Sequence, residues 1–196
     1  MTKDEYWYHI SFHKVERARD FIEDKKIRNM ANKLISVQKE RYAINKSMPN
    51  TQTIAKICWA IRVHPSDLVT FYNYEIVDRY WEKKPKLRNN CVGDVTYLPL
   101  RELLYDRYGS KEWKKMFKKL CDICPTPEQS EEYYERQQKL MDKLYGEGKV
   151  AIKKDNVGLS EKTRANLMKD RPVPMYVIYE ICRILHCPVD CVMGYK

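Results

Sequence analysis

The two ends of the sequence match each other at a spacing of 124 residues, over more than thirty residues without a gap. Ile35-Ser36 aligns with Leu159-Ser160, and further apolar positions coincide: Ile44 with Met168, Ile54 with Ile178, Ile57-Cys58 with Ile181-Cys182, Ile61 with Leu185, Val63 with Cys187 and Leu68 with Val192. Omitting one residue after Leu185 would instead align Pro65 and Asp67 with Pro188 and Asp190, so two registers of the ending stay open. We expect one supersecondary unit to occur twice in this chain.

The apolar positions recur at intervals of three and four residues, which is typical of amphipathic helices. The chain also has only 6 Gly, which is few for the tight turns of an all-β protein. The spacing and the low glycine content together predict an all-α fold. The pattern predicts N-terminal helices over 14–26 (with Val15, Ala18, Phe21 and Ile22 on one face), 28–34, 37–45 and 51–62, and a short helix after the break at 64–67. Further helices are predicted over 100–108, 110–121 and 126–145, while Val95 to Leu98 is left unassigned.

The domain organisation follows from the repeat and from the interval between its copies. Residues 83–99 lose the helical periodicity and contain Pro85, Asn89-Asn90 and Gly93-Asp94, which is typical of a linker or long loop. We therefore predict an N-terminal domain over 1–82, a linker and helical middle segment over 83–125, and a C-terminal domain over 126–196.

The charge balance favours a polyanionic partner. The chain has 37 Lys and Arg against 27 Asp and Glu, a formal net charge of +10, as expected for a protein that binds nucleic acid or an anionic surface. No apolar run has the length of a signal peptide or of the ~20 residues that span a bilayer. We expect a cytoplasmic protein without membrane association, whose seven cysteines are reduced.

The repeated unit resembles the Cro/λ-repressor (XRE-like) helix-turn-helix family. The C-terminal likeness covers about 133–195 and rests on Gly158-Leu159-Ser160-Glu161-Lys162-Thr163-Arg164-Ala165-Asn166-Leu167, Arg171-Pro172-Val173, Ile178, Ile181-Cys182 and Leu185. The N-terminal likeness covers about 14–71 and rests on Ile35-Ser36, Pro49, Ile54, Ile57, Ile61 and Val63-His64-Pro65-Ser66-Asp67-Leu68. The resemblance implies two five-helix domains, each with a third helix that reads DNA, in a sequence-specific transcriptional regulator of phage or mobile-element type.

The resemblance also implies which residues contact double-stranded DNA. Ser36 and Ser160 would cap the third helices, whose exposed positions would enter the major groove. These positions are Val37, Gln38, Lys39, Arg41 and Tyr42 in the first copy and Glu161, Lys162, Thr163 and Asn166 in the second. Phosphate contacts would come from Arg28, Asn29, Lys46, Lys149, Lys153 and Lys169. The two DNA-reading helices of one chain could lie one helical turn apart along the duplex, about 34 Å.

The chain departs from the family pattern at several positions. Gly158 supplies the glycine of the turn before the third helix, but Leu34 stands at the equivalent place in the first copy. Glu40 and Arg164 occupy positions where a core-facing apolar residue is expected, and Ile152 lies one residue away from its expected position. Either copy can therefore have kept the fold while its DNA-binding surface changed.

No catalytic or metal-binding pattern stands out from the sequence, so we expect neither an enzyme nor a cofactor. Cys121-Asp122-Ile123-Cys124 has metal-ligand spacing, but no second pair lies at zinc-finger spacing, and His9 with His13 lacks further ligands. The aromatic clusters, 6–8, 72–74 and 80–81, fit either core packing or a protein interface. The alternative function is therefore an inhibitor or antitoxin-like module that keeps helix-turn-helix folds and binds a protein. The partner at these aromatic residues would be another protein or a second copy of this chain.

Overall fold

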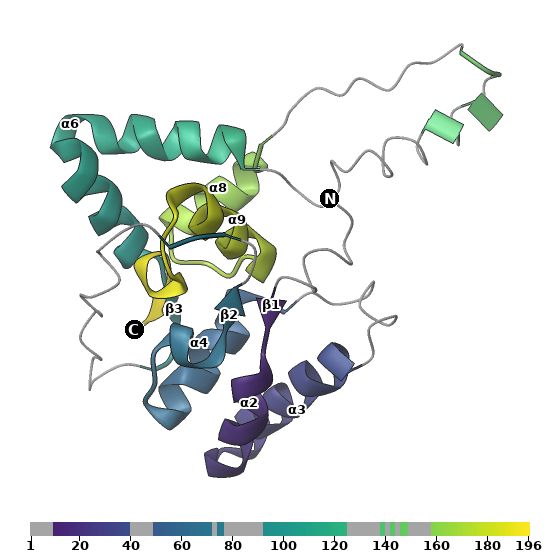
Figure 1. Cartoon of the computed structure of the whole chain (residues 1–196), viewed down its shortest axis with the longest axis vertical. Coiled ribbons are helices and arrows are strands. Elements are labelled where there is room, and N and C mark those ends of the chain that lie inside the picture. The colour runs from purple at the N-terminus through teal and green to yellow at the C-terminus, as the bar shows by residue number, and fades with distance from the viewer. Residues whose placement is uncertain are drawn as a thin grey trace.

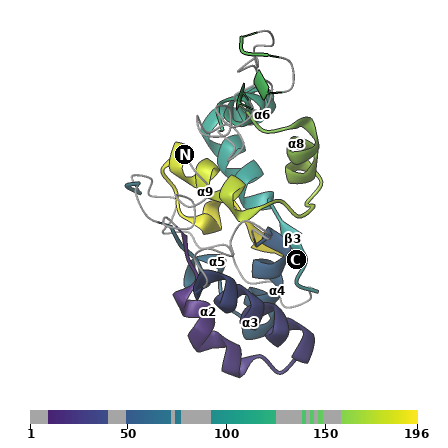
Figure 2. The same ribbon diagram turned by 90° about the vertical axis from the view of Figure 1, so that its right-hand side faces the viewer.

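The computed structural model describes residues 10–39, 49–71, 74–76, 92–124, 138–139, 142–143, 146–148 and 158–196, and these form a largely α-helical molecule (Figure 1). The N-terminal elements α2 to α5 occupy one end, and α6, α8 and α9 occupy the other (Figure 2). The predicted all-α class is confirmed in this coarse form. The predicted helix over 126–145 lies almost entirely outside the described residues. No helix in the described ranges is both long and apolar enough to cross a membrane.

The N-terminal repeat, residues 10–71, consists of β1 (Ile10–Ser11), α2 (His13–Ala18), a 3-10 turn η1 (Arg19–Phe21), α3 (Lys25–Lys39), α4 (Thr51–Ile61), α5 (Pro65–Leu68) and β2 (Thr70–Phe71). Asp24 begins α3, because its Oδ1 accepts the Lys26 and Ile27 backbone N–H groups at 2.8 and 3.0 Å. Asn50 caps α4 in the same way, accepting from the N–H of Thr53 at 3.0 Å. β1 pairs antiparallel with β2, which brings the two ends of the repeat together.

The C-terminal repeat, residues 95–195, consists of β3 (Val95–Thr96), α6 (Leu98–Ile123), α8 (Glu161–Met168), α9 (Met175–Leu185), a 3-10 turn η5 (Val189–Cys191) and β4 (Gly194–Tyr195). Gly109 has φ 74° and ψ 172° and divides α6 into two helices, as the two predictions over 100–108 and 110–121 required. β3 pairs antiparallel with β4, so this repeat is also closed by its own ends. Residues 98–124 fall within the interval 83–125 that the sequence predicts as a linker and helical middle segment, and the Cys121 carbonyl accepts the Leu159 N–H.

From Asn50 and Pro174 onward, the 124-residue repeat is present in the backbone. α4 and α9 have identical lengths, and Arg62 and His186 end them in the left-handed conformation, with φ 59° and 51°. After these residues the Val63 N–H donates to the Cys58 carbonyl, and the Cys187 N–H donates to the Cys182 carbonyl. Val69 then donates to Pro65 as Met193 donates to Val189, both at 2.9 Å. The gapless register of the ending is therefore correct.

The beginnings of the two repeats also match, at a spacing of 85 residues that the sequence comparison missed. Phe12 and Tyr97 are both buried and precede α2 and α6 with nearly the same backbone angles, φ −111° in each. The Val95-Thr96 pair, left unassigned from sequence, is the strand equivalent to β1. Each repeat therefore begins with one short strand and ends with another, and the two strands of the same repeat pair with each other.

The two repeats face each other across a pseudo-two-fold axis, the pseudo-dyad. Asn50 and Pro174, which are equivalent positions, form an antiparallel bridge. The Thr51 N–H donates to the Val173 carbonyl at 2.9 Å, and the equivalent Met175 N–H donates to the Pro49 carbonyl at 3.0 Å. Reciprocal bonds of this kind, in which the second follows from the first by exchanging the copies, define an isologous contact.

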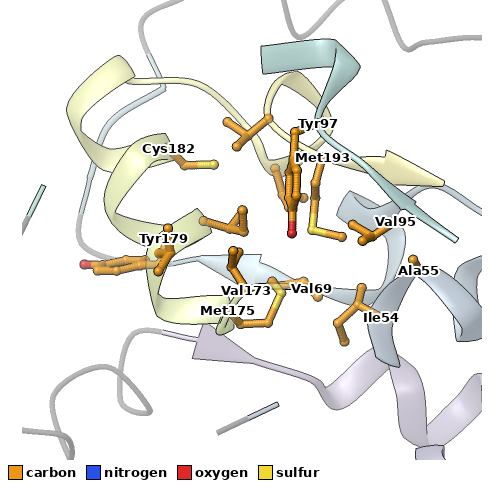
Figure 3. Close-up of a cluster of buried hydrophobic side chains, with 14 of the residues drawn as sticks. Ile54, Ala55, Val69, Val95, Tyr97, Val173, Met175, Tyr179, Cys182 and Met193 are labelled. Atoms are coloured by element: carbon orange, nitrogen blue, oxygen red, sulfur yellow. The ribbon is translucent and has the colours of Figure 1, made fainter. Parts of the chain in front are cut away.

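Side chains from both repeats fill one continuous core at the pseudo-dyad. Figure 3 shows Ile54 and Val69 from the first repeat beside Val173 and Met175 from the second, with Tyr97 pointing into the same cluster. The buried Thr51 hydroxyl lies 2.6 Å from the Tyr97 hydroxyl and accepts the Val173 N–H at 3.1 Å. Phe71 packs edge-on against Tyr179, so the N-terminal repeat also contacts α9.

Two local predictions in the first repeat are wrong. Ser36 does not begin a helix, because α3 runs through it to Lys39 while Ile27, Ala31, Leu34 and Ile35 continue one buried stripe. A serine is tolerated inside a helix when the buried face is uninterrupted. Phe21 is not on the buried face: it is 78% exposed, because the 3-10 turn rotates it away while Ile22 remains buried.

Candidate nucleic-acid interface

The C-terminal repeat contains a packed helix pair formed by the second part of α6, residues 110–123, and α8. The Leu159 N–H donates to the Cys121 carbonyl at 2.8 Å, so the backbone just before α8 is attached to the end of α6. We call these two helices, together with residues Gly158–Ser160 that directly precede α8, the α6–α8 pair.

Gly158 allows the close approach of the two backbones. A Cβ at this position would lie 2.8 Å from the Asp122 carbonyl oxygen and 3.1 Å from that of Cys121, well inside van der Waals contact. Its φ of +150° is also one that other residues rarely adopt. The glycine expected from sequence in this turn is therefore required by the geometry of the pair.

Ser160 caps α8 as predicted. Its hydroxyl oxygen accepts the Thr163 N–H at 3.2 Å and lies 3.0 Å from the Thr163 hydroxyl. On α8, Glu161, Lys162 and Met168 are exposed, Leu167 is buried and the other residues are half-buried, so one side of this helix faces solvent. A capped helix with one exposed side has the form needed to enter a groove.

Arg164 joins the two helices of the pair. Its Nε donates to the Leu159 carbonyl at 2.7 Å, and its Nη1 lies 2.6 Å from Asp122 Oδ1 on α6. The sequence pattern expected an apolar residue here. The structure shows that the arginine makes the inter-helix contact by a hydrogen bond and an ion pair instead.

The predicted recognition residues of the C-terminal copy all lie on α8, but with different degrees of exposure. Glu161 and Lys162 are exposed, and Lys169 is exposed directly after the helix. Thr163 and Asn166 are half-buried, and the Asn166 side chain donates to the Pro172 carbonyl at 3.4 Å. The predicted phosphate contacts Lys149 and Lys153 lie outside the described residues.

The predicted contact residues of the N-terminal copy are only partly described. Arg28 and Asn29 are exposed on α3, and Arg28 Nε donates to the Ile22 carbonyl at 2.7 Å. Val37, Gln38 and Lys39 lie in the last turn of α3 rather than at the start of a separate helix, and their side chains are outside the described part. Arg41, Tyr42 and Lys46 also fall outside the described residues.

A lysine-rich face on α6 was missed in the sequence analysis. Lys111, Lys115 and Lys118 are exposed and lie three, four or seven residues apart on the side that carries Asp122, the partner of Arg164 on α8. Lys114 and Lys119 are exposed beside this face. The signal was present in the sequence as five lysines within nine residues, arranged around the apolar positions Trp113, Phe117 and Leu120.

An ion-pair cluster holds the turn that follows α8. Asp170 accepts from both terminal nitrogens of Arg101, at 3.0 and 3.2 Å, from Lys196 Nζ at 2.9 Å and from the Tyr97 N–H at 2.8 Å. Burial acts to raise the pKa of Asp170, but these hydrogen bonds outweigh it and lower the pKa to about 2. Arg101 also donates to the Leu167 carbonyl at 3.2 Å, which attaches the end of α8 to α6.

The cysteines in the described part of the chain are buried, except Cys191, which is half-buried. Burial raises the pKa of Cys121 to about 12 and raises that of Cys124 further, so both thiols of the Cys-x-x-Cys pair stay protonated. In the described part of the chain, no group of three His, Cys, Asp or Glu side chains is placed to hold a metal. Tyr74 packs edge-on against Tyr179 and donates to the Cys187 carbonyl at 2.9 Å. The aromatic residues at 6–8, 72–73 and 80–81 lie outside the described residues.

Comparisons with known proteins add no relative: no family model matches the chain, and neither a curated protein nor a solved structure is significantly similar to it.

Proposed function

We propose that this chain is a sequence-specific double-stranded DNA-binding protein, a transcriptional regulator built from two helix-turn-helix units of the Cro/λ-repressor type. The units would be the two repeats, 10–71 and 95–195, in place of the divisions at 82 and 125 expected from sequence. In the C-terminal unit, α8 would be the reading helix, held in place by the second part of α6.

The observation that carries the proposal is the pseudo-dyad. The reciprocal bonds from Thr51 to Val173 and from Met175 to Pro49 place the repeats as two subunits of a symmetric dimer are placed. Repressors of this architecture read duplex DNA as two half-sites, and the symmetry of the protein mirrors that of the site. A single chain with two repeats related in this way offers the same arrangement.

The charge around the α6–α8 pair supports the same function. Lys111, Lys115 and Lys118 form a basic face on the side of α6 that contacts α8, and Lys162 and Lys169 are exposed at either end of α8. Cations beside an exposed helix suit a duplex, because they bind phosphates while the helix reaches base edges. Lys162 is an exposed, positively charged candidate for a base contact.

A protein-binding function is the second candidate. Tyr105 and Tyr108 are 51% and 39% exposed and lie three residues apart on α6, before the kink at Gly109. Exposed tyrosines on one helix face are typical of protein interfaces. An inhibitor or antitoxin-like module would use such a surface and would not bind DNA.

The experiment that tests the proposal is a binding selection of the purified full chain on randomised duplex DNA, at about 150 mM salt with excess competitor. We expect one motif to be enriched, and Lys162→Ala to weaken binding to it by about 1–3 kcal/mol, the loss of one base contact. Lys14→Ala, exposed on α2, is the matched control. Binding without enrichment would contradict sequence-specific reading. No binding would refute the proposal and favour the protein-binding candidate.

A further inference from the structure

We propose that the chain binds DNA as a single molecule, on a site made of two unlike half-sites. This inference rests on the proposed function and specifies its substrate. A regulator with one helix-turn-helix unit must dimerise to bind two half-sites. Here the corresponding surface is already used inside the chain.

The surface at the pseudo-dyad is complete within one molecule. Thr51, Val173 and Met175 are buried there, and Asp190 is only 4% exposed because it contacts Ser66 of the other repeat. The Ser66 N–H donates to Asp190 Oδ1 at 2.9 Å, and the Ser66 hydroxyl donates to Oδ2. A second chain would have to displace these contacts in order to use the same surface.

The residues at the pseudo-dyad also favour the pairing of unlike repeats over that of like repeats. Ser66 and Asp190 are equivalent positions, so pairing two C-terminal repeats would bring two nearly buried carboxylates together. Like charges in such a place repel strongly. Two C-terminal repeats are therefore a poor dimer.

Two N-terminal repeats would also pair poorly. Thr51 now bonds to the Tyr97 hydroxyl and to the Val173 N–H. In a pair of N-terminal repeats, Phe12 would stand in place of Tyr97 and Pro49 in place of Val173, and neither can make these bonds. The Thr51 hydroxyl would then be buried without a partner, which is unfavourable. The contact therefore selects one repeat of each kind.

The two candidate reading segments expose different side chains. Arg28 and Asn29 are exposed on α3 of the first repeat, whereas Glu161 and Lys162 are exposed on α8 of the second. Different side chains at the reading positions select different bases. A single chain would therefore prefer a site with two different halves over a palindrome.

The test uses the full chain, the duplex obtained by selection and two symmetrised duplexes that carry either half-site twice. We expect light scattering to give one chain per selected duplex, and each palindrome to bind at least about tenfold more weakly, since a single mismatched base pair costs this much or more. Two chains per duplex, or a palindrome bound as tightly as the selected site, would overturn the inference and leave the proposed function standing. No binding to any duplex would refute the proposed function, and this inference with it.

Discussion

Ser66 and Asp190 are 124 residues apart in the chain, occupy equivalent positions in its two repeats and hydrogen-bond to each other at the pseudo-dyad. Residues that meet their own equivalents lie on or beside a two-fold axis, so this contact marks where the halves of the molecule are joined. Asn50 and Pro174 meet in the same way at the start of α4 and α9. The repeats are therefore joined at two places, and at each place a residue contacts its own equivalent in the other repeat.

Removing the Ser66 hydroxyl should loosen this contact. We expect Ser66→Ala to lower the free energy of unfolding by about 1–2 kcal/mol, because a hydroxyl bonded to a nearly buried carboxylate is lost. Ser66→Asp should lower it further, since a second carboxylate would face Asp190. Urea unfolding followed by circular dichroism measures both. Ser110→Ala, at an exposed position of α6, is the control and should change the free energy of unfolding by less than about 0.5 kcal/mol. Equal effects for all three variants would show that the contact contributes nothing.

Replacing Gly158 should disturb the α6–α8 pair. We expect Gly158→Ala to lower the free energy of unfolding by about 1–3 kcal/mol, because the new Cβ would overlap the Asp122 carbonyl. Gly109→Ala is the matched control: its φ is also positive, at 74°, but no atom lies within 4 Å of the added Cβ. Gly109→Ala should therefore show only the cost of its backbone conformation, φ 74° and ψ 172°, about 1–3 kcal/mol for a non-glycine residue, and Gly158→Ala should show the overlap in addition to such a cost. If the control is destabilised as much as Gly158→Ala, close approach of the two helices is not the reason for the glycine.

Asp170 should make stability depend on pH. Its folded pKa of about 2 lies below its ordinary value of 3.8, so its stabilising effect is complete above the ordinary pKa and is lost as the pH falls from about 4 to 2. We expect Asp170→Asn to be less stable by roughly 2 kcal/mol at pH 7 and to approach the unmodified protein near pH 2. Asn also tolerates the left-handed conformation at this position, with φ 53°, so the variant removes mainly the charge. Unfolding curves at pH 7, 4, 3 and 2 measure the difference. A gap that stays constant across this range would contradict the prediction.

The lysine face of α6 should contribute to DNA affinity through phosphates. We expect Lys115→Ala with Lys118→Ala to weaken binding to all duplexes alike. The slope of log K against log salt concentration should become less steep by about 1 for each lost phosphate contact. Titrations at several salt concentrations give the slope, with Lys14→Ala on α2 as the comparison. An unchanged slope in the double variant would show that this face does not contact the duplex.

The second part of each repeat could be recognised from sequence because it depends on local patterns. α4 and α9 have the same apolar stripe, the same length and the same left-handed end, and every one of these signals lies within about fifteen residues. The first part could not be aligned in the same register. The C-terminal repeat has a longer segment before α9 than the N-terminal repeat has before α4, which changes the spacing from 85 residues at Phe12 and Tyr97 to 124 at Asn50 and Pro174. A single-offset comparison therefore missed half of the repeat.

Contacts between residues far apart in the sequence explain why other structural roles could not be predicted from sequence. Arg164 seemed misplaced because its partner Asp122 lies 42 residues earlier in the chain. Serine is common at helix caps, which is why the sequence predicts a cap at Ser36. No local feature shows that Leu34 and Ile35 belong to one uninterrupted helix that continues through Ser36. No local pattern marks Asp170, because its partners Arg101 and Lys196 lie far away in the sequence.

The most direct test of the account is a hydroxyl-radical footprint of the full chain on its selected duplex, with variants in each reading segment. The account predicts two protected patches on one face of the duplex, about one helical turn apart. Arg28→Ala with Asn29→Ala, on α3 of the first repeat, should weaken one patch, and Lys162→Ala should weaken the other. A single protected patch, or variants that weaken both patches equally, would contradict the claim that the two repeats are two DNA-reading units.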